Sequence, residues 1–415
     1  MLLRQRSLAA LLTAEIVSTT GSLMSTLALP WFVLVTTGSP ARMGVTMAAE
    51  LVANALAGLP GGTLAARLGA RRTMLIADAA RAPLVALIPI LSWLGLLSFP
   101  VLIAIVFTLG CFFAPYLASQ RSILPELLGE DERLLGQANA LLGGAERLTI
   151  VLGPPLAGLL ITVTSASAVL LIDAATFLVS FVLLAGLVPS GRPLGEDPGG
   201  LLVGVRTLLA DRLLRAWLFT SSAFELAWQA MFAAVPVLAF IRYDGDARVA
   251  GWLFAAFGAG ALAGNVLAYR ALVRIPGLVL APLAKIPQAA AFWLLAFGTS
   301  AWLVGGVLAV TGICNGLINA PFMAVQTSRL PRAVRTQALT ASLTISLLAG
   351  GVGLACAGPA LGHFGLHPVF LGIATIHTIG GVIFTAAGLR ARRAVLRAAF
   401  ADGGDQRLEG AGVRG

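Results

Sequence analysis

The chain has 415 residues, of which 58% are hydrophobic and only 11% are charged, and its net charge is +10. Soluble domains carry about a quarter charged residues, so this composition excludes an ordinary soluble protein. Helices of about 20 apolar residues cross a bilayer because their backbone hydrogen bonds are satisfied internally. The composition therefore predicts an integral membrane protein built from helices.

Apolar stretches long enough to span a membrane follow one another along the chain. The first begins after Arg4 and Arg6 and is too long for the apolar core of a signal peptide, so we expect it to remain as a span. Together the stretches predict an all-α membrane protein with twelve transmembrane helices. The expected ranges are 9–36, 43–66, 73–95, 98–120, 138–163, 167–189, 213–241, 249–269, 278–299, 301–325, 337–361 and 367–389.

Arginine is distributed unevenly between the loops on the two sides. Loops on the side of the amino terminus contain clusters at 67–72, 206–215, 329–335 and 390–397, whereas the opposite loops contain Arg42, Arg242 and Arg248. Cytoplasmic loops are enriched in positive residues, so both termini are predicted to be cytoplasmic. The dominance of arginine over lysine is typical of GC-rich bacteria, which suggests a multi-pass protein of a bacterial inner membrane. The arginines of the cytoplasmic loops then account for the positive net charge, and no nucleic acid partner is expected.

The second half of the chain repeats the pattern of the first. APYLASQRSILP at 114–125 matches APFMAVQTSRLP at 320–331, and ANALAG at 53–58 matches AGALAG at 259–264 at the same interval. A constant interval indicates two pseudo-symmetric six-helix halves in parallel orientation. We expect these halves at 1–189 and 213–390, a cytoplasmic linker with an amphipathic helix at 190–212, and a disordered cytoplasmic tail at 391–415.

A short basic turn, GGTLAARLGARRTML at 61–75, separates the second and third expected helices. It resembles the signature of the major facilitator superfamily, Gly-x-Leu-Ala-Asp-Arg-x-Gly-Arg-Lys. The signature's acid is replaced by Ala66, and one of its basic residues is replaced by Ala70. The residues that match the signature are Gly62, Leu64, Ala65, Arg67, Gly69 and Arg71.

The fifth expected helix carries Gly153, Pro154 and Gly158, which resemble the Gly-Pro motif of the superfamily's antiporters. The stretches SLMSTLALPWFVLVTTGSPARMG, QANALLGGAERLTIVLGPPLAGLL and LLIDAATFLVS are similar to the bacterial branch of enterobactin and macrolide exporters. The resemblance implies the major facilitator fold, with a substrate cavity between the halves and transport by alternating access. In that family the basic turn helps to latch the outward-facing state.

Two explanations stay open for the charges of the basic turn. The glycines allow a sharp turn and close helix packing, and Arg67, Arg71 and Arg72 can pair with acids at other helix ends, as a latch requires. Alternatively, because the acid of the signature is lost, the arginines only keep the turn in the cytoplasm. Asp78 and Arg81, one helical turn apart, are candidates for a substitute pair or for a purely structural ion pair.

Acids inside the expected spans are the candidates for proton coupling, because an unpaired charge in a membrane is costly. Glu225 lies about 18 Å along the seventh span, near mid-membrane, and Gln229 follows one turn later on the same face. The seventh span lines the cavity in the fold that the chain resembles, so Glu225 could bind a proton or a cation. The alternative is a hydrogen-bonded glutamic acid without a role in the transport cycle.

Four other charged residues lie within the expected spans. Glu50 and Glu15 lie nearer the outer and inner ends of their helices and are further candidates for the cavity, although we expect snorkelling or a local salt bridge for both. Asp173 is expected to be structural. Lys285 is expected to snorkel toward the cytoplasmic side.

Signals for enzymatic chemistry are missing from the sequence. It has no phosphate-binding loop and no set of nucleophile, base and oxyanion donors, so we expect neither an enzyme nor a cofactor or metal site. The predicted function is a secondary transporter that exports a small, amphipathic molecule (a drug, natural product or siderophore) by proton antiport. Its expected partners are this substrate, protons and the lipid bilayer, and it is expected to be a monomer. An uptake permease or a non-transporting membrane sensor is the alternative.

Overall fold

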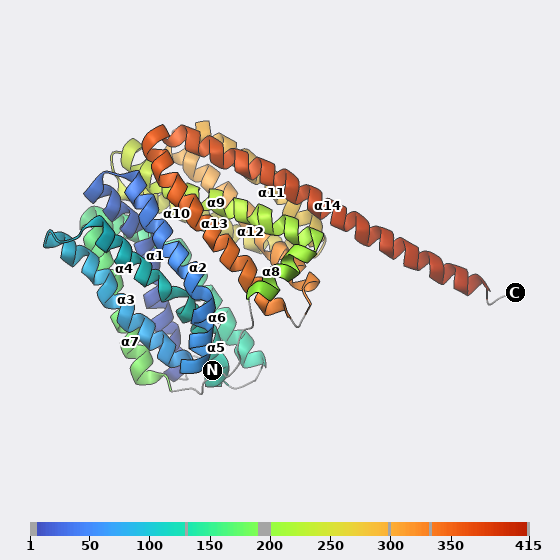
Figure 1. Ribbon diagram of the computed structural model, residues 1–415, viewed down its shortest axis with the longest axis horizontal. Coiled ribbons are helices and arrows are strands. Elements are labelled where there is room, and N and C mark those ends of the chain that lie inside the picture. Colours follow the sequence, from blue (N-terminus) through green and yellow to red (C-terminus); the bar gives the residue numbers. More distant parts are fainter. Residues whose placement is uncertain (1–5, 129–131, 190–200, 298–299, 332–333, 413–415) are drawn as a thin grey trace.

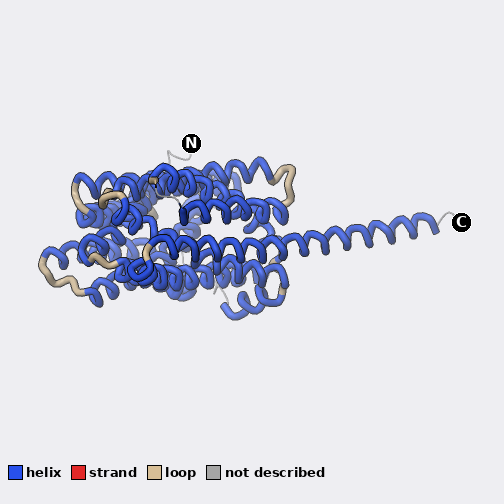
Figure 2. Tube along the Cα trace, turned by 90° about the horizontal axis from the view of Figure 1, so that it is seen from above, coloured by secondary structure: helices blue, strands red, loops and turns tan. Residues whose placement is uncertain are grey.

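Every secondary-structure element is a helix in the part of the chain that this computed structural model describes, residues 6–128, 132–189, 201–297, 300–331 and 334–412 (Figures 1 and 2). The apolar stretches form helices because no water is available in a bilayer to satisfy backbone groups. The helices are α1 (Arg6–Thr37), α2 (Pro40–Leu68), α3 (Ala70–Trp93), α4 (Phe99–Cys111), α5 (Phe113–Leu128), α6 (Glu132–Val163), α7 (Ala166–Leu187), α8 (Leu201–Ala210), α9 (Arg212–Arg242), α10 (Ala247–Ala271), α11 (Gly277–Phe297), α12 (Ala301–Arg329), α13 (Arg335–Phe364) and α14 (Leu366–Gly412).

Eleven helical segments of the described chain are long and apolar enough to cross a membrane. One of them, Phe99–Leu124, combines α4 with most of α5, because a single turn residue, Phe112, separates these two helices. The helix α2 has 29 residues and packs against α4 and α13 in the same bundle, so it completes the set of twelve. The predicted all-α fold with twelve membrane helices is confirmed.

The bundle consists of two groups of helices with matching internal contacts. Within the first group, α1 packs on α7, α2 on α4, and α3 on α7. The equivalent pairs recur in the second group, where α9 packs on α14, α10 on α12, and α11 on α14. Figure 1 shows the first group in blue to green and the second in yellow to red. This is the arrangement that the internal sequence repeat leads one to expect.

The two halves meet at one end of the bundle. We call the end that holds the start of α1 and the α2–α3 turn the terminal face, and the end that holds the loops at Gly38 and Gly245 the opposite face. Near the opposite face, α2 and α13 touch through their backbones, since a Cβ atom on Gly44 would lie only 2.7 Å from Cα of Gly358. Small residues permit this close approach.

The second contact between the halves, α6 against α10, widens away from the opposite face. A Cβ atom on Gly158 would lie 2.5 Å from the carbonyl oxygen of Ala247. At Gly258, further along α10 toward the terminal face, the nearest atoms of α6 are 3.6 Å from the corresponding position. The halves are therefore packed most tightly against each other at the opposite face, and the packing of α6 on α10 loosens toward the terminal face.

The linker contains the predicted short helix, α8, and residues 190–200 before it lie outside the described residues. The helix α8 packs against α13, where a Cβ atom on Gly204 would collide with the backbone of Gln337. It ends at Ala210 because Asp211 caps the next helix: its carboxylate accepts hydrogen bonds from the backbone N–H groups of Leu213 and Leu214.

The last helix, α14, continues beyond the bundle to Gly412 and projects clear of it (Figures 1 and 2). The tail at 391–415 was expected to be disordered, and its backbone is drawn as a continuation of α14 over residues 391–412. Residues 390–400 consist almost entirely of Arg, Ala and Leu, which are strong helix formers and extend the membrane helix without a stop signal.

Candidate functional site

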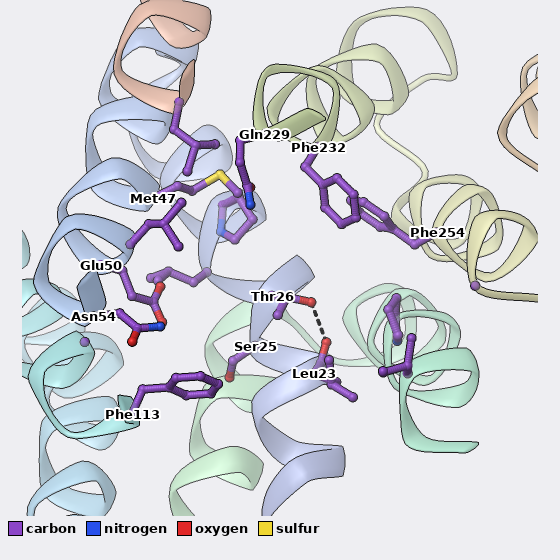
Figure 3. A pocket seen from close by; sticks show the side chains of 18 of the residues that line it. Leu23, Ser25, Thr26, Met47, Glu50, Asn54, Phe113, Gln229, Phe232 and Phe254 are labelled. Carbon is purple, nitrogen blue, oxygen red and sulfur yellow. Dashed lines mark hydrogen bonds between the residues drawn. The ribbon is translucent and has the colours of Figure 1, made fainter. Parts of the chain in front are cut away.

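A cavity of about 340 Å³ lies between the two halves (Figure 3). Its walls come from both halves, and most of the lining is apolar or aromatic, including Phe113, Phe232 and Phe254. Figure 3 shows Glu50 of α2 and Gln229 of α9 both reaching into this space. The cavity therefore combines an apolar wall with a small number of polar groups, which is the usual composition of a small-molecule site.

A larger cavity of about 710 Å³ lies within the C-terminal half and shares Gln229 and Phe257 with the first. Because the two cavities share these lining residues, we treat them as one central cavity with an apolar part between the halves and a polar part in the C-terminal half. The charged, amide, hydroxyl and imidazole groups of the polar part are Ser221, Glu225, Gln229, Lys285, Gln288, Asn315, Asn319, Gln326, Thr340, Ser342, Ser346 and His377.

Glu225 lines the polar part, next to Gln229, which lines both parts. The amide of Gln229, one turn later on α9, donates a hydrogen bond of 2.9 Å to Oε1 of Glu225. The ion pairs in the described chain join Arg81 to Asp78, Arg248 to Asp246, and Arg329 to Asp211, so none of them involves Glu225. Gly350 of α13 packs against the side chains of Glu225 and Gln229 and leaves room for both.

Glu50 does not snorkel and forms no ion pair among the described residues, contrary to our expectation. Its side chain lines the apolar part of the cavity, together with Met47 and Asn54 from the same face of α2 (Figure 3). The backbone of α2 is held at this point by α4, because Gly110 packs directly on the carbonyl group of Glu50. This packing turns Glu50 toward the cavity rather than toward the membrane surface.

Glu15 belongs to a separate polar cluster in the N-terminal half and does not line the central cavity. It is 3% exposed, and its carboxylate accepts hydrogen bonds from the hydroxyl of Tyr116 at 2.9 Å and the amide of Gln120 at 2.6 Å. The expected snorkelling is wrong, because these two α5 side chains satisfy the carboxylate inside the bundle. Asp173 likewise accepts hydrogen bonds from Ser25 and Thr176, as a structural role requires.

Lys285 also points into the protein, so its expected snorkelling is wrong. It is 7% exposed, and its ammonium donates a hydrogen bond of 2.9 Å to the side-chain oxygen of Gln288. The same ammonium lies 3.4 Å from the centre of the Phe224 ring, which is a cation–π contact. Beside it, the ring of His377 lies between Phe224 and Phe292. The inward face of α11 thus brings the chain's lysine to the polar part of the cavity.

The basic turn is fastened to the end of α7. Gly69 has φ +85°, a conformation that favours glycine, so the sharp turn between α2 and α3 requires this residue. Arg71 donates hydrogen bonds to the carbonyl oxygens of Leu184 and Ala185 in the last turn of α7. Arg67 and Arg72 are exposed. The surroundings of Gly62 and Leu64 lie outside the described part of the structure.

The predicted pair of Asp78 and Arg81 is formed and fully enclosed. Their side chains are 2.6 Å apart, with Asp78 0% and Arg81 4% exposed. Ser180 of α7 donates a second hydrogen bond to Asp78, and the guanidinium of Arg81 stacks between the rings of Tyr116 and Phe177. The pair therefore connects α3, the helix that follows the basic turn, with α5 and α7.

A family model described as the Major Facilitator Superfamily matches residues 11–354. The chain belongs to this superfamily. The twelve-helix architecture and the central cavity between the halves are those that the sequence resemblance implied.

Among superfamily proteins, the chain is similar to the "Multidrug efflux pump Tap" of Mycobacterium tuberculosis (strain ATCC 25618 / H37Rv), with 28% identity over 379 residues, covering 88% of this chain and 89% of that protein. The protein of the same name from Mycolicibacterium fortuitum is 26% identical over 387 residues, which cover 90% and 93% of the two chains.

Solved structures show the same fold. The nucleoside transporter NupG superposes with a TM-score of 0.78 at 13% identity, covering 92% of this chain and 98% of NupG. A bacterial homologue of the human lysosomal transporter Spinster superposes with a TM-score of 0.72 at 15% identity, covering 92% and 97%. Identities this low show the fold alone.

The Gly-Pro motif of this superfamily member packs on both halves. Gly153 contacts Leu23 of α1, and Gly158 contacts Ala247 of α10. Pro154, the proline of the motif, packs against Gly251 of α10. The motif thus forms part of the closed contact near the opposite face.

Several polar residues inside the bundle were missed from the sequence, although the repeat contained a signal for one pair. Gln120 and Gln326 occupy equivalent positions in the two copies of the repeated segment. Both are hydrogen-bonded inside their own half of this superfamily fold, Gln120 to Glu15 and Gln326 to Ser342. A polar residue kept in both copies of an apolar repeat could therefore have been recognised as a buried hydrogen-bonding group.

Proposed function

We propose that this chain is a secondary active transporter that exports small, amphipathic molecules such as drugs in exchange for protons. The similarity to multidrug efflux pumps extends over almost the whole chain, which supports export. The central cavity supports an amphipathic substrate, since aromatic rings line one part and amides, acids and a lysine line the other.

The state of the transporter follows from its topology. The arginine distribution assigns the terminal face to the cytoplasm. Because the halves are in contact near the opposite face, the cavity in this conformation receives its substrate from the cytoplasm. Alternating access then requires the α2–α13 and α6–α10 contacts to open and the terminal face to close. The basic turn, fastened to α7 through Arg71, is our candidate for the latch of that closed terminal face.

The observation that carries proton coupling is the environment of Glu225. Its carboxylate lies in the cavity, has a single amide partner and is not neutralised by an ion pair among the described residues. An acid of this kind prefers to be protonated when it is enclosed and to release its proton when the cavity is hydrated. Substrate loading from the cytoplasm would accompany release of this proton, and substrate release outside would allow Glu225 to be protonated again. Glu50, across the cavity, is the second candidate for this role.

The direct test uses ethidium as an amphipathic probe and inside-out membrane vesicles from cells that lack their own ethidium pumps. An acidified vesicle lumen should drive ethidium into vesicles that contain the protein, and a protonophore should abolish this accumulation. Vesicles without the protein serve as the control. Ethidium movement that is independent of the pH gradient would overturn proton antiport. Movement out of the vesicles would support the uptake permease instead.

A further inference from the structure

A groove of about 570 Å³ runs between α11 and α14 on the outer surface of the C-terminal half. Its rims carry the exposed apolar side chains of Ile286, Trp293 and Leu389, which face the hydrocarbon of the bilayer. Between the rims, the small residues Ala290 and Gly381 leave the space open. This volume falls within the range of about 300–1,000 Å³ that is typical of sites for drug-sized ligands.

Lys285 separates this groove from the central cavity, because its side chain lines both. The stem lies next to the groove, where a Cβ atom on Gly381 would be 3.8 Å from Cβ of Lys285. The ammonium lies on the cavity side, against Gln288 and the Phe224 ring. A single flexible side chain therefore borders the hydrocarbon phase on one side and the polar part of the cavity on the other.

The charge of Lys285 has no acidic partner in the described chain. Its contacts are a neutral amide and an aromatic ring, and the ion pairs of the described residues do not include it. A positive charge next to hydrocarbon is costly, and a carboxylate or similar anion offers the strongest hydrogen-bond acceptor for it. Charge complementarity thus favours an anionic ligand whose apolar body can occupy the groove.

We propose that the groove between α11 and α14 is a lateral entry site for anionic amphiphiles dissolved in the bilayer. The apolar body of the ligand lies along the groove, and its anionic group reaches the Lys285 ammonium beside the central cavity. This proposal rests on the proposed export function, because it names a class of substrate for the same central cavity and a route by which that substrate enters it.

The test is photolabelling of the full chain in lipid nanodiscs with a diazirine-bearing fatty acid and with the corresponding fatty alcohol. A diazirine near the end of the acyl chain should label peptides of α11 and α14. The double variant Ala290→Leu/Gly381→Leu fills the groove and should lower this labelling at least five-fold. Ala104→Leu, an exposed alanine on the lipid-facing surface of α4, is the matched control and should leave it unchanged.

The charge is tested separately with Lys285→Gln, which keeps a polar side chain without the ammonium. It should weaken labelling by the fatty acid several-fold and leave labelling by the alcohol unchanged. Equal labelling of all lipid-facing helices, labelling that persists in the groove-filled variant, or equal loss of both probes in Lys285→Gln would overturn the proposal. Labelling requires no transport, so its failure is distinguishable from failure of ethidium export, and size-exclusion profiles show whether each variant is folded.

Discussion

Glu225 accepts a hydrogen bond of 2.9 Å from the amide of Gln229, one turn later on α9, and both side chains line the central cavity. The i to i+4 spacing places them on the same face of the helix. The hydrogen bond fixes the position of the carboxylate without removing its charge. This relationship leads to the first prediction.

Glu225→Gln keeps the size and hydrogen-bonding capacity of the side chain but cannot titrate. We expect it to retain downhill ethidium exchange and to lose accumulation driven by a pH gradient, by about ten-fold or more if coupling depends on this proton. The measurement is gradient-driven ethidium transport in inside-out vesicles. Glu15→Gln and Glu50→Gln are the comparisons, and each should reduce gradient-driven transport less than Glu225→Gln does. The carboxylate of Glu15 lies in a separate hydrogen-bonded cluster. If gradient-driven transport persists in Glu225→Gln and is lost in Glu50→Gln, the coupling group is Glu50.

Gly69→Leu and Arg71→Ala test the basic turn. A leucine would be strained at φ +85°, at a cost of about 1–3 kcal/mol, and Arg71→Ala removes the hydrogen bonds to the end of α7. If the turn is a latch, ethidium transport should fall in both variants while their amounts in the membrane stay near normal. The exposed Arg72→Ala is the control. Normal transport in Gly69→Leu and Arg71→Ala would leave topology as the function of these arginines.

Asp78→Asn tests whether the enclosed pair with Arg81 stabilises the N-terminal half. Removing one partner leaves a buried guanidinium charge uncompensated, which typically destabilises a protein by about 3–5 kcal/mol. We expect a clear loss of thermal stability in detergent. Asp246→Asn provides a matched control, because Asp246 pairs with Arg248 at the surface and such pairs contribute about 0–1 kcal/mol. Equal effects of the two substitutions would contradict the assignment.

Asp211 lies at the start of α9, outside the membrane-spanning segment, and its environment predicts that its contribution to the stability of the protein depends on pH. Partial burial acts to raise the pKa of Asp211, but the backbone N–H groups of Leu214 and Leu213 and the guanidinium of Arg329 together hold this pKa below its ordinary value. A lowered pKa in the folded state means that the stabilising contribution is present above the unfolded-state pKa and is lost as the pH falls through the folded-state pKa. It should therefore be complete at neutral pH and fade below about pH 4.

The corresponding experiment compares thermal unfolding of the wild type, Asp211→Asn, Arg329→Gln and the double variant at several pH values. Asparagine still caps the helix, so Asp211→Asn isolates the charge. The coupling between the two sites should be measurable at pH 7 and should shrink toward pH 3.5. Coupling that does not change with pH would show that the ionic form of Asp211 contributes nothing to it.

Topology is tested with alkaline phosphatase fusions after Arg42, Arg242 and His363. All three positions lie at the opposite face, so all three fusions should be active outside the cytoplasm. A fusion after Arg72 in the basic turn should be inactive. An inactive fusion at any of the first three positions would overturn the assignment of both termini to the cytoplasm.

The sequence by itself determined the class of the protein and the course of its helices. A bilayer imposes length and apolarity on every span, so the twelve stretches could be read directly. The α2–α3 turn was visible as a short segment with three glycines and three arginines between two apolar stretches, and Gly69 of this segment adopts the positive φ that the turn requires. The spacing of Asp78 and Arg81 likewise predicted an ion pair, since residues three apart on a helix are neighbours.

Only the tertiary structure decided which polar side chains face the cavity. Glu15, Glu50 and Lys285 each stand in an apolar helix. Snorkelling was expected for Lys285, and snorkelling or a local salt bridge was expected for Glu15 and Glu50, which were also candidates for the cavity. In a membrane protein the lipid-facing and inward-facing sides of a helix are both apolar, so the sequence contains little of the pattern that orients a helix in a soluble protein. Rotation about the helix axis is set by packing on neighbouring helices, as where Gly110 packs on α2 and turns Glu50 inward. The same packing satisfies Glu15 with Tyr116 and Gln120 and places Lys285 between the groove and the central cavity.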